Sequence, residues 1–248
     1  MIEIIGIEKS FNGQKVLQGV NLTIADREVM AIIGESGGGK TVLLRHLIGL
    51  MKPDKGSILV DGEDISKMSK GELDRVRDRF GIVFQGSALF DSMTVFENIV
   101  FPLREKTDYD DKEILDRGKQ ALEDVGLSGI GDKYTSEISG GMKRRVALAR
   151  ALIIGPTTIF FDEPTTGLDP IIMNTIHRLI TKTHIKYGFT GIIISHEIPE
   201  IFDVADKVAM LYRGRIIASG TQAEIYRVDD PIVRQFIGTC HYEDVENP

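Results

Sequence analysis

Short apolar runs separated by turns occupy the first third of the chain and predict β-strands. Residues 4–11 and 16–25 are predicted to be two strands joined by a turn at 12–14. The wholly apolar run 29–33 is typical of a buried strand, and the mostly apolar segment 42–50 after it predicts a helix. The other strands expected in this part are 57–60 and 81–85.

The spacing of the apolar residues changes in the middle of the chain. From about residue 86 to residue 155, apolar residues recur at intervals of three and four, which is the period of an amphipathic helix. The helices expected there are 95–103, 112–125 and 141–154. This part is therefore predicted to be an inserted helical subdomain.

Alternating strands and helices return in the last third. The expected elements are a strand at 159–161, a helix at 170–187, a strand at 191–195 and a hairpin over 208–218 that turns at Arg213-Gly214. Buried strands that alternate with helices imply a mostly parallel sheet with helices on both faces.

One eight-residue segment within this α/β pattern predicts a phosphate-binding loop. It matches the phosphate-binding pattern G-x-x-x-x-G-K-[ST] at every fixed position, and it lies between a predicted strand and a predicted helix. Its residues are Gly34, Glu35, Ser36, Gly37, Gly38, Gly39, Lys40 and Thr41. Backbone N–H groups of such a loop surround phosphate oxygens, while Lys40 reaches the β- and γ-phosphates and Thr41 holds Mg²⁺. The alternative is a glycine-rich turn without a ligand.

The predicted fold class is thus α/β, a P-loop NTPase (RecA-like) core with an antiparallel β subdomain and an inserted helical subdomain. A single ATPase domain is expected over 1–238. Its core and β subdomain would occupy about 1–85 and 156–238, and its helical subdomain about 86–155. A polar C-terminal tail over 239–248 would fray alone or rest on a partner subunit.

Composition narrows the class of protein. The net charge of −7 argues against a nucleic-acid surface, and the single cysteine, Cys240, rules out a disulfide framework within one chain. The N-terminus lacks the basic and apolar regions of a signal peptide. No run approaches the roughly 18 to 20 apolar residues of a membrane span, so contact with a membrane is expected only through partners.

A second chemical signal is the acid pair at the end of the apolar run 159–161. Asp162 follows that run, which places a carboxylate at the carboxyl end of a strand, where it would orient the Mg²⁺ shell. Glu163 follows at once and suits a general base that polarises the attacking water. The alternative is that the two acids cap the next helix.

A third signal is Ser139-Gly140-Gly141, which opens a basic amphipathic helix and resembles an anion site at a helix N-terminus. With this turn the chain resembles the ATP-binding cassette (ABC) ATPases, whose signature reads Leu-Ser-Gly-Gly-Gln. Ile138 and Met142 depart from that signature, while the Ser-Gly-Gly core is retained. In that family, one subunit's signature contacts the γ-phosphate held by the other's P-loop. The resemblance therefore implies a homodimer with ATP sandwiched between two copies.

The resemblance extends over nearly the whole chain and assigns roles to further residues. Phe11 resembles the aromatic residue that stacks on adenine, or else is a strand core residue. Gln85 resembles the Q-loop glutamine, a ligand of Mg²⁺, and Asp169 lies in a segment like the D-loop that meets the partner subunit. His196 resembles the switch histidine on the γ-phosphate, and Val42 extends the nucleotide-binding loop. The catalytic set implied is Lys40, Gln85, Glu163 and His196, with ATP and Mg²⁺ as cofactors.

Three segments, 84–105, 142–151 and 162–171, are similar to the ATPase of bacterial maintenance-of-lipid-asymmetry systems. That similarity implies phospholipid transport between the inner and outer membranes. The partners implied are a second copy of the chain, transmembrane permease subunits, MCE-domain proteins and small accessory subunits. The implied location is the cytoplasmic side of the inner membrane, as a peripheral protein.

Other functions remain open at this point. An ABC transporter for another substrate is the first alternative, because nothing in the ATPase chain contacts the cargo. A soluble cassette in DNA repair or translation is the second. The single cassette, the lack of a long coiled coil and the net charge of −7 argue against it. A P-loop kinase would leave the Ser-Gly-Gly helix and His196 unexplained.

Overall fold

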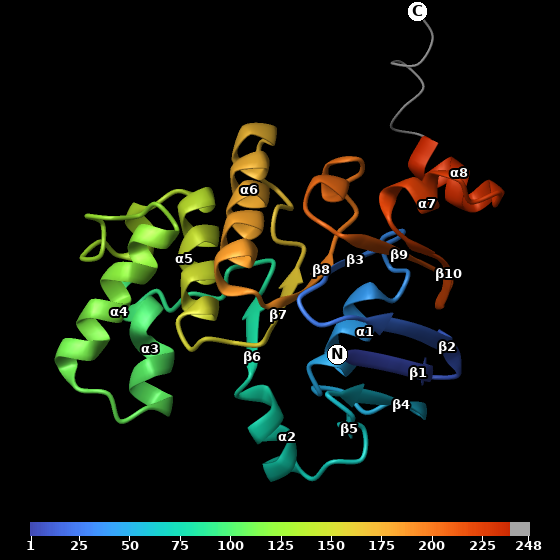
Figure 1. Ribbon diagram of the computed structural model, residues 1–248, viewed down its shortest axis with the longest axis horizontal. Coiled ribbons are helices and arrows are strands. Elements are labelled where there is room, and N and C mark those ends of the chain that lie inside the picture. Colours follow the sequence, from blue (N-terminus) through green and yellow to red (C-terminus); the bar gives the residue numbers. More distant parts are fainter. Residues whose placement is uncertain (239–248) are drawn as a thin grey trace, which may run out of the picture. The chain divides into compact units, whose positions relative to one another are not determined.

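The computed structural model describes residues 1–238, which fall into two compact units (Figure 1). The first unit comprises Met1–Arg77 and the chain from Thr190 onward, and the second is Asp78–Phe189. The predicted tail at 239–248 lies outside the described residues. The predicted division into a core and a helical subdomain at about 86–155 groups the chain differently and stays a prediction.

The first unit contains an antiparallel sheet with the strand order β2-β1-β4-β5. Its strands are β1 (Ile2–Phe11), β2 (Gln14–Ile24), β4 (Lys55–Val60) and β5 (Glu63–Asp64). Buried positions such as Ile2, Ile4 and Ile7 place one face of β1 in the core, as in a half-buried sheet. The predicted antiparallel β subdomain is confirmed.

A second, mostly parallel set of strands lies in the same unit. β3 (Val29–Ile33) pairs in parallel with β8 (Thr190–Ile194) and with β9 (Lys207–Tyr212). β10 (Arg215–Gly220) returns antiparallel to β9 through the predicted turn at Arg213-Gly214. All five residues of β3 and all five of β8 are buried, which explains why these strands have no polar alternation.

The helices of the first unit include three that the sequence analysis did not predict. The predicted helix is α1 (Lys40–Leu47). The helices that were not predicted are α2 (Lys70–Arg77), α7 (Gln222–Tyr226) and α8 (Pro231–Gly238), and a 3-10 turn lies at Glu200–Asp203. Helix α2 buries only Leu73 and Val76, so its apolar period is too short to stand out from the polar residues around it. Across the described residues, none of the helices combines the length and apolar content needed to span a bilayer.

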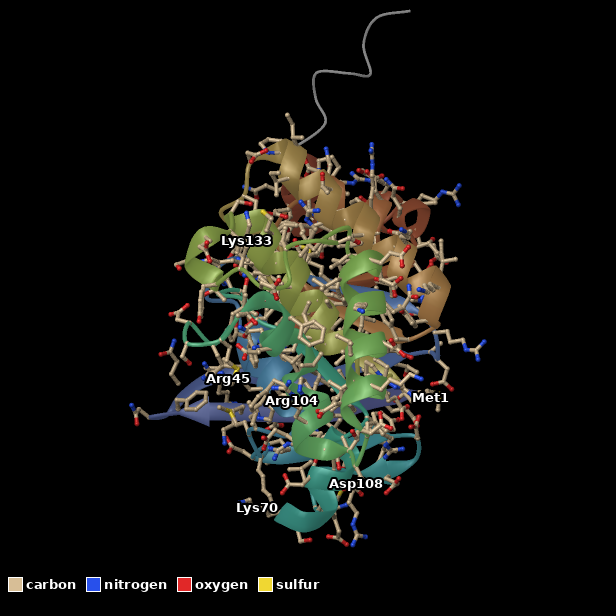
Figure 2. The ribbon with its side chains drawn as sticks, turned by 90° about the vertical axis from the view of Figure 1, so that its left-hand side faces the viewer. Met1, Arg45, Lys70, Arg104, Asp108 and Lys133 are labelled. Atoms are coloured by element: carbon tan, nitrogen blue, oxygen red, sulfur yellow. The ribbon has the colours of Figure 1, made fainter. Side chains whose placement is uncertain are left out.

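The second unit combines two parallel strands with a helical bundle (Figure 1). Its elements are β6 (Phe80–Val83), α3 (Val95–Lys106), α4 (Asp111–Asp124), a 3-10 turn (Thr135–Glu137), α5 (Gly140–Leu152), β7 (Thr158–Asp162) and α6 (Pro170–Tyr187). Ile99, Leu122 and Val146 of α3, α4 and α5 belong to one buried apolar cluster. Exposed charged side chains, including Arg104 and Lys133, cover the bundle's outer surface (Figure 2).

Local signals explain where the helices of this unit begin and end. Thr94 and Glu97 form a reciprocal capping box at the start of α3. At the start of α6, Asp169 accepts hydrogen bonds from two backbone N–H groups, and Pro170 occupies the first helical position. Gly188 ends α6 with a φ of 66°, a left-handed conformation that glycine adopts without steric cost. The predicted bounds of α6, 170–187, agree with the structure.

Asn98 fixes the chain that enters α3. Its side chain is fully buried, with 0% exposure. The Oδ1 atom accepts from the Phe90 N–H at 2.8 Å. The Nδ2 atom donates to the carbonyl oxygens of Phe90 and Thr94, each at 3.0 Å, and of Met93 at 3.3 Å. One amide thus satisfies the polar backbone of a turn that has no regular structure of its own.

We predict that Asn98→Ala destabilises the chain by about 2 kcal/mol, because the part-buried Phe90 N–H loses its acceptor and the Met93 carbonyl loses a donor. Chemical denaturation followed by circular dichroism measures the change. Asn174→Ala, at an exposed position of α6, is the control and should change the free energy of unfolding by less than about 0.5 kcal/mol. Equal effects of the two substitutions would contradict the role assigned to Asn98.

Candidate functional site

The loop between β3 and α1 lies tightly against β9. A Cβ atom on Gly34 would be 2.1 Å from the Leu211 carbonyl oxygen, so no larger residue fits at the start of the loop. Gly39, the residue before α1, has a φ of 102° and provides no side-chain cap for the helix. The first N–H groups of α1 point out of the helix start, where the positive end of the helix dipole stabilises an anion.

Lys40 lies inside this loop. Its side chain is 5% exposed, and Nζ donates hydrogen bonds to the carbonyl oxygens of Gly34, at 2.7 Å, and Glu35, at 2.9 Å. The ammonium group is thus held over the backbone that surrounds a phosphate in loops of this kind. Thr41 follows and is exposed, so its hydroxyl faces solvent at the same helix start.

His196 lies at the carboxyl end of β8, on the same sheet as the P-loop strand. Ser195 before it is buried, its N–H donates to the Ile32 carbonyl at 3.2 Å, and its Oγ accepts from the Glu197 N–H at 3.0 Å. These bonds fix the turn that presents the exposed His196. Because β3 and β8 are parallel, His196 and the P-loop follow strand ends at one edge of the sheet.

Phe11 ends β1 and is 40% exposed, so the alternative that it is a strand core residue is wrong. The Lys9 ammonium lies 5.7 Å from the centre of its ring. An exposed aromatic face at this position is compatible with base stacking. Its contact with adenine stays a prediction.

In the second unit, the structure brings Gln85 and Glu163 together. β6 and β7 are parallel, so the residues that follow them meet at one edge. The Gln85 Nε2 atom donates to Glu163 Oε2 at 3.2 Å, and the Thr166 hydroxyl donates to the same oxygen at 3.1 Å. Asp162 is the last residue of β7. The carboxylate of Glu163 is therefore oriented by two donors.

Glu163 also has a strained backbone, with a φ of 47°. Such a left-handed conformation costs a non-glycine residue free energy and is concentrated at functional sites. Sequence reasoning missed Thr166, whose hydroxyl orients this carboxylate. The available signal was its position three residues after Glu163, a spacing at which a threonine hydroxyl reaches back to an acid in a turn.

The signature segment has structural roles of its own. Ser139 is the N-cap of α5, and its Oγ accepts from the Met142 N–H at 3.3 Å. A Cβ atom on Gly141 would lie 2.6 Å from Ile172 Cγ2 of α6, so close helix packing requires glycine there. Ser139 and Gly140 are exposed at the helix start, where an anion would be stabilised. Their contact with a partner's nucleotide, and that of Asp169 with the partner subunit, stay predictions.

The described residues contain no group of three or more His, Cys, Asp or Glu side chains placed to hold a metal ion. The residues predicted to bind Mg²⁺, Thr41, Gln85 and Asp162, offer a hydroxyl, an amide and one carboxylate. All three are oxygen donors, the ligand type that Mg²⁺ prefers. The donor set therefore fits a magnesium ion that is shared with phosphate oxygens and water.

Comparison with known proteins agrees with this geometry. A family model described as ABC transporter matches residues 17–166, more than half of the chain. The chain is 42% identical over 236 residues to the probable ribonucleotide transport ATP-binding protein mkl of Mycobacterium tuberculosis, covering 95% of this chain and 66% of that protein. It thus spans slightly less than two thirds of the mycobacterial relative.

A second relative is the intermembrane phospholipid transport system ATP-binding protein MlaF of Escherichia coli. It is 42% identical over 222 residues, covering 90% of this chain and 82% of MlaF. A dimeric structure of the ATP-binding cassette MJ0796, in a post-hydrolysis state with ADP and Pi, has a TM-score of 0.81 at 28% identity. That match covers 89% of this chain and 98% of the other. The chain therefore belongs to the ABC transporter family, as one of its ATPase cassettes.

Proposed function

We propose that this chain hydrolyses ATP to power phospholipid transport between the inner and outer membranes, as the nucleotide-binding subunit of an MCE-type ABC transporter. The observation that carries the proposal is the similarity to MlaF, at 42% identity over 222 residues. The site geometry supports the chemistry, because the phosphate loop and the oriented Glu163 carboxylate are both present.

ATP binding begins at the P-loop. The N–H groups at the start of α1 and the ammonium of Lys40 stabilise the charge on the β- and γ-phosphates. During phosphoryl transfer this charge spreads over the equatorial oxygens, and fixed donors aimed at them lower the barrier. Exposed Phe11 offers a face for the adenine ring.

Thr41, Asp162 and Gln85 are the residues proposed to hold Mg²⁺, which neutralises phosphate charge when bound. Glu163 accepts a proton from the attacking water as general base. The hydrogen bonds from Gln85 and Thr166 orient the carboxylate for that step. His196, presented by the turn after β8, contacts the γ-phosphate.

The complete site is proposed to require two copies of the chain. Ser139, Gly140 and Gly141 of one copy close on the γ-phosphate held by the other, and Asp169 lies near the contact. The dimeric structures of MJ0796 support this arrangement, since they are similar cassettes over 98% of their length. Hydrolysis removes the phosphate bridge, and the dimer opens.

Work on the cargo is proposed to pass through permease subunits, with MCE-domain and small accessory subunits completing the system. The chain would act at the cytoplasmic side of the inner membrane, attached through these partners. Phe90 is 42% exposed, and its ring lies against the Phe101 ring in a tilted arrangement at a centroid distance of 4.9 Å. Exposed aromatic surface after Gln85 suits an apolar helix of a permease. Phe96, in contrast, packs on the buried helical cluster.

Ribonucleotide transport is the second candidate, because it is the function named for mkl at the same 42% identity. Both candidates use the same ATPase chemistry and differ only in the cargo. A cassette in DNA repair or translation is disfavoured by the net charge of −7 and by the transport proteins among the relatives.

We predict that Glu163→Gln binds ATP, hydrolyses it at least about a hundredfold more slowly and accumulates a closed dimer, because an amide cannot accept the proton from water. Phosphate release and size-exclusion chromatography with ATP measure both effects. Glu123→Gln, at an exposed position of α4, removes the same charge and should retain normal turnover. Near-normal hydrolysis by Glu163→Gln would mean that another group is the base.

Ser139→Arg should prevent dimer closure while nucleotide binding by the single chain stays within about twofold of normal, since the P-loop is untouched. The substitution also removes a helix cap, which costs about 1 kcal/mol. Ser69→Arg, at an exposed serine directly before α2, controls for a bulky cation at a helix start. If ATP-dependent dimerisation survives in Ser139→Arg, the signature segment does not meet the partner's nucleotide.

The cargo is tested by purifying the chain from membranes with its partners. We expect a permease and an MCE-domain protein to accompany it, and phospholipid to be extracted from the complex. Mass spectrometry of both proteins and lipids makes the measurement. If the partner proteins bind ribonucleotides, and neither an MCE-domain protein nor phospholipid is recovered, the result would favour ribonucleotide transport.

A further inference from the structure

Arg144, on the signature helix α5, contacts two loops that are distant in sequence. Its Nη1 atom donates to the Phe84 carbonyl at 3.0 Å and lies 3.3 Å from the Ser87 hydroxyl oxygen. Its Nη2 atom donates to the Thr166 carbonyl at 3.3 Å. The side chain is 9% exposed, so the guanidinium group spans the space between the loop after β6 and the loop after β7.

These contacts close a ring of hydrogen bonds around the proposed general base. From Arg144 the ring passes through the Phe84 carbonyl to the adjacent Gln85, whose amide donates to Glu163. Glu163 accepts from the Thr166 hydroxyl, and the Thr166 carbonyl accepts from Arg144. Each of the two donors to the carboxylate is therefore anchored, through its own backbone or its neighbour's, by one guanidinium group.

The loop after β6 needs such an anchor. Ser87 and Ala88 both have positive φ values, 61° and 46°, which are unfavourable for residues with a Cβ atom. Ser87 is buried, and its carbonyl accepts a second arginine bond, from Arg150 Nη2 at 2.9 Å. Two arginines of α5 thus hold a strained loop in one conformation.

The Arg144 guanidinium donates to two backbone carbonyls and a serine hydroxyl, which are all neutral acceptors. Burial lowers the pKa of its guanidinium below the usual value, because desolvation disfavours the charged form. Burying a cation among neutral acceptors costs free energy. We therefore expect the position of the guanidinium to serve a purpose other than stability. The planar fork suits this place, since it donates in two directions at once, which a lysine ammonium on a flexible stem does less well.

We propose that Arg144 is a positioning residue for hydrolysis: it holds Gln85 and Thr166 so that the Glu163 carboxylate is aligned, and it makes that alignment depend on the position of α5. Arg144 lies on the helix that Ser139 caps. A displacement of the helix start by nucleotide contact therefore changes the anchor of the general base. This inference rests on the proposed role of Glu163 and adds a residue that does not touch ATP.

The test compares Arg144→Gln, Arg144→Lys and Thr166→Val in the full chain, purified with its membrane partners. We expect kcat to fall about tenfold or more in each, while KM for ATP stays within about twofold, since misalignment affects the chemical step and leaves the P-loop intact. The lysine variant should fail to restore kcat because it keeps the charge but loses the fork. Arg117→Gln, an exposed arginine paired with Glu113 on α4, is the control and should retain normal kcat.

A double variant separates positioning from a general loss of structure. Arg144→Gln combined with Thr166→Val should lower kcat by about as much as the larger single effect, because both act on one carboxylate. Multiplicative effects, or kcat within twofold of normal in Arg144→Lys and Thr166→Val, would overturn the proposal. If Arg144→Gln does not fold, those two variants decide. If Glu163→Gln loses hydrolysis while the Arg144 variants hydrolyse ATP normally, only the role of Arg144 is refuted. If Glu163→Gln itself hydrolyses ATP normally, the proposed general base is refuted as well.

Discussion

Parallel pairing of buried strands is the constraint on which the chemistry of this chain depends. Within the first unit, β3 and β8 run in parallel, so the P-loop and His196 follow strand ends at one edge. Within the second unit, β6 and β7 do the same for Gln85 and Glu163. These strands are mostly apolar and buried, so polar side chains that can act on a ligand gather at and just after their carboxyl ends. Strand order in the sheet thus selects which side chains can act together.

The edge of the second unit where Gln85 meets Glu163 keeps its geometry at a cost in free energy. Glu163, Ser87 and Ala88 all have left-handed backbones, and Arg144 is buried among neutral acceptors. Strained backbone conformations of this kind persist only where several independent contacts hold the residue in place. Here the surroundings are the two arginines of α5 and the hydroxyl of Thr166. The same bonds that offset the strain orient the carboxylate, so rigidity and reactivity have one origin.

The separation of ATP chemistry from cargo follows from the same architecture. Relatives named for phospholipid and for ribonucleotide transport are each 42% identical to this chain. The side chains of Lys40, Gln85 and Arg144 all contact other residues of the cassette itself. In the proposed function, specificity for the cargo arises where exposed surface of this chain, such as Phe90, meets a permease. Equal similarity to relatives with different cargoes is what this arrangement predicts.

Sequence reasoning located the elements that have strong local signals, and it failed where the signal is short or non-local. The wholly apolar β3 and the capped helix α6 were predicted closely, because a buried run, Pro170 and Gly188 are all local signals. Helix α2 was missed because two buried residues cannot establish a period. The roles of Arg144 and Thr166 were missed for a different reason. Arg144 meets a carbonyl 60 residues away, and only the parallel pairing of β6 with β7 brings that carbonyl and Glu163 within reach of one side chain. A motif names the residues that touch the substrate, whereas the residues that hold them depend on how the chain folds back on itself.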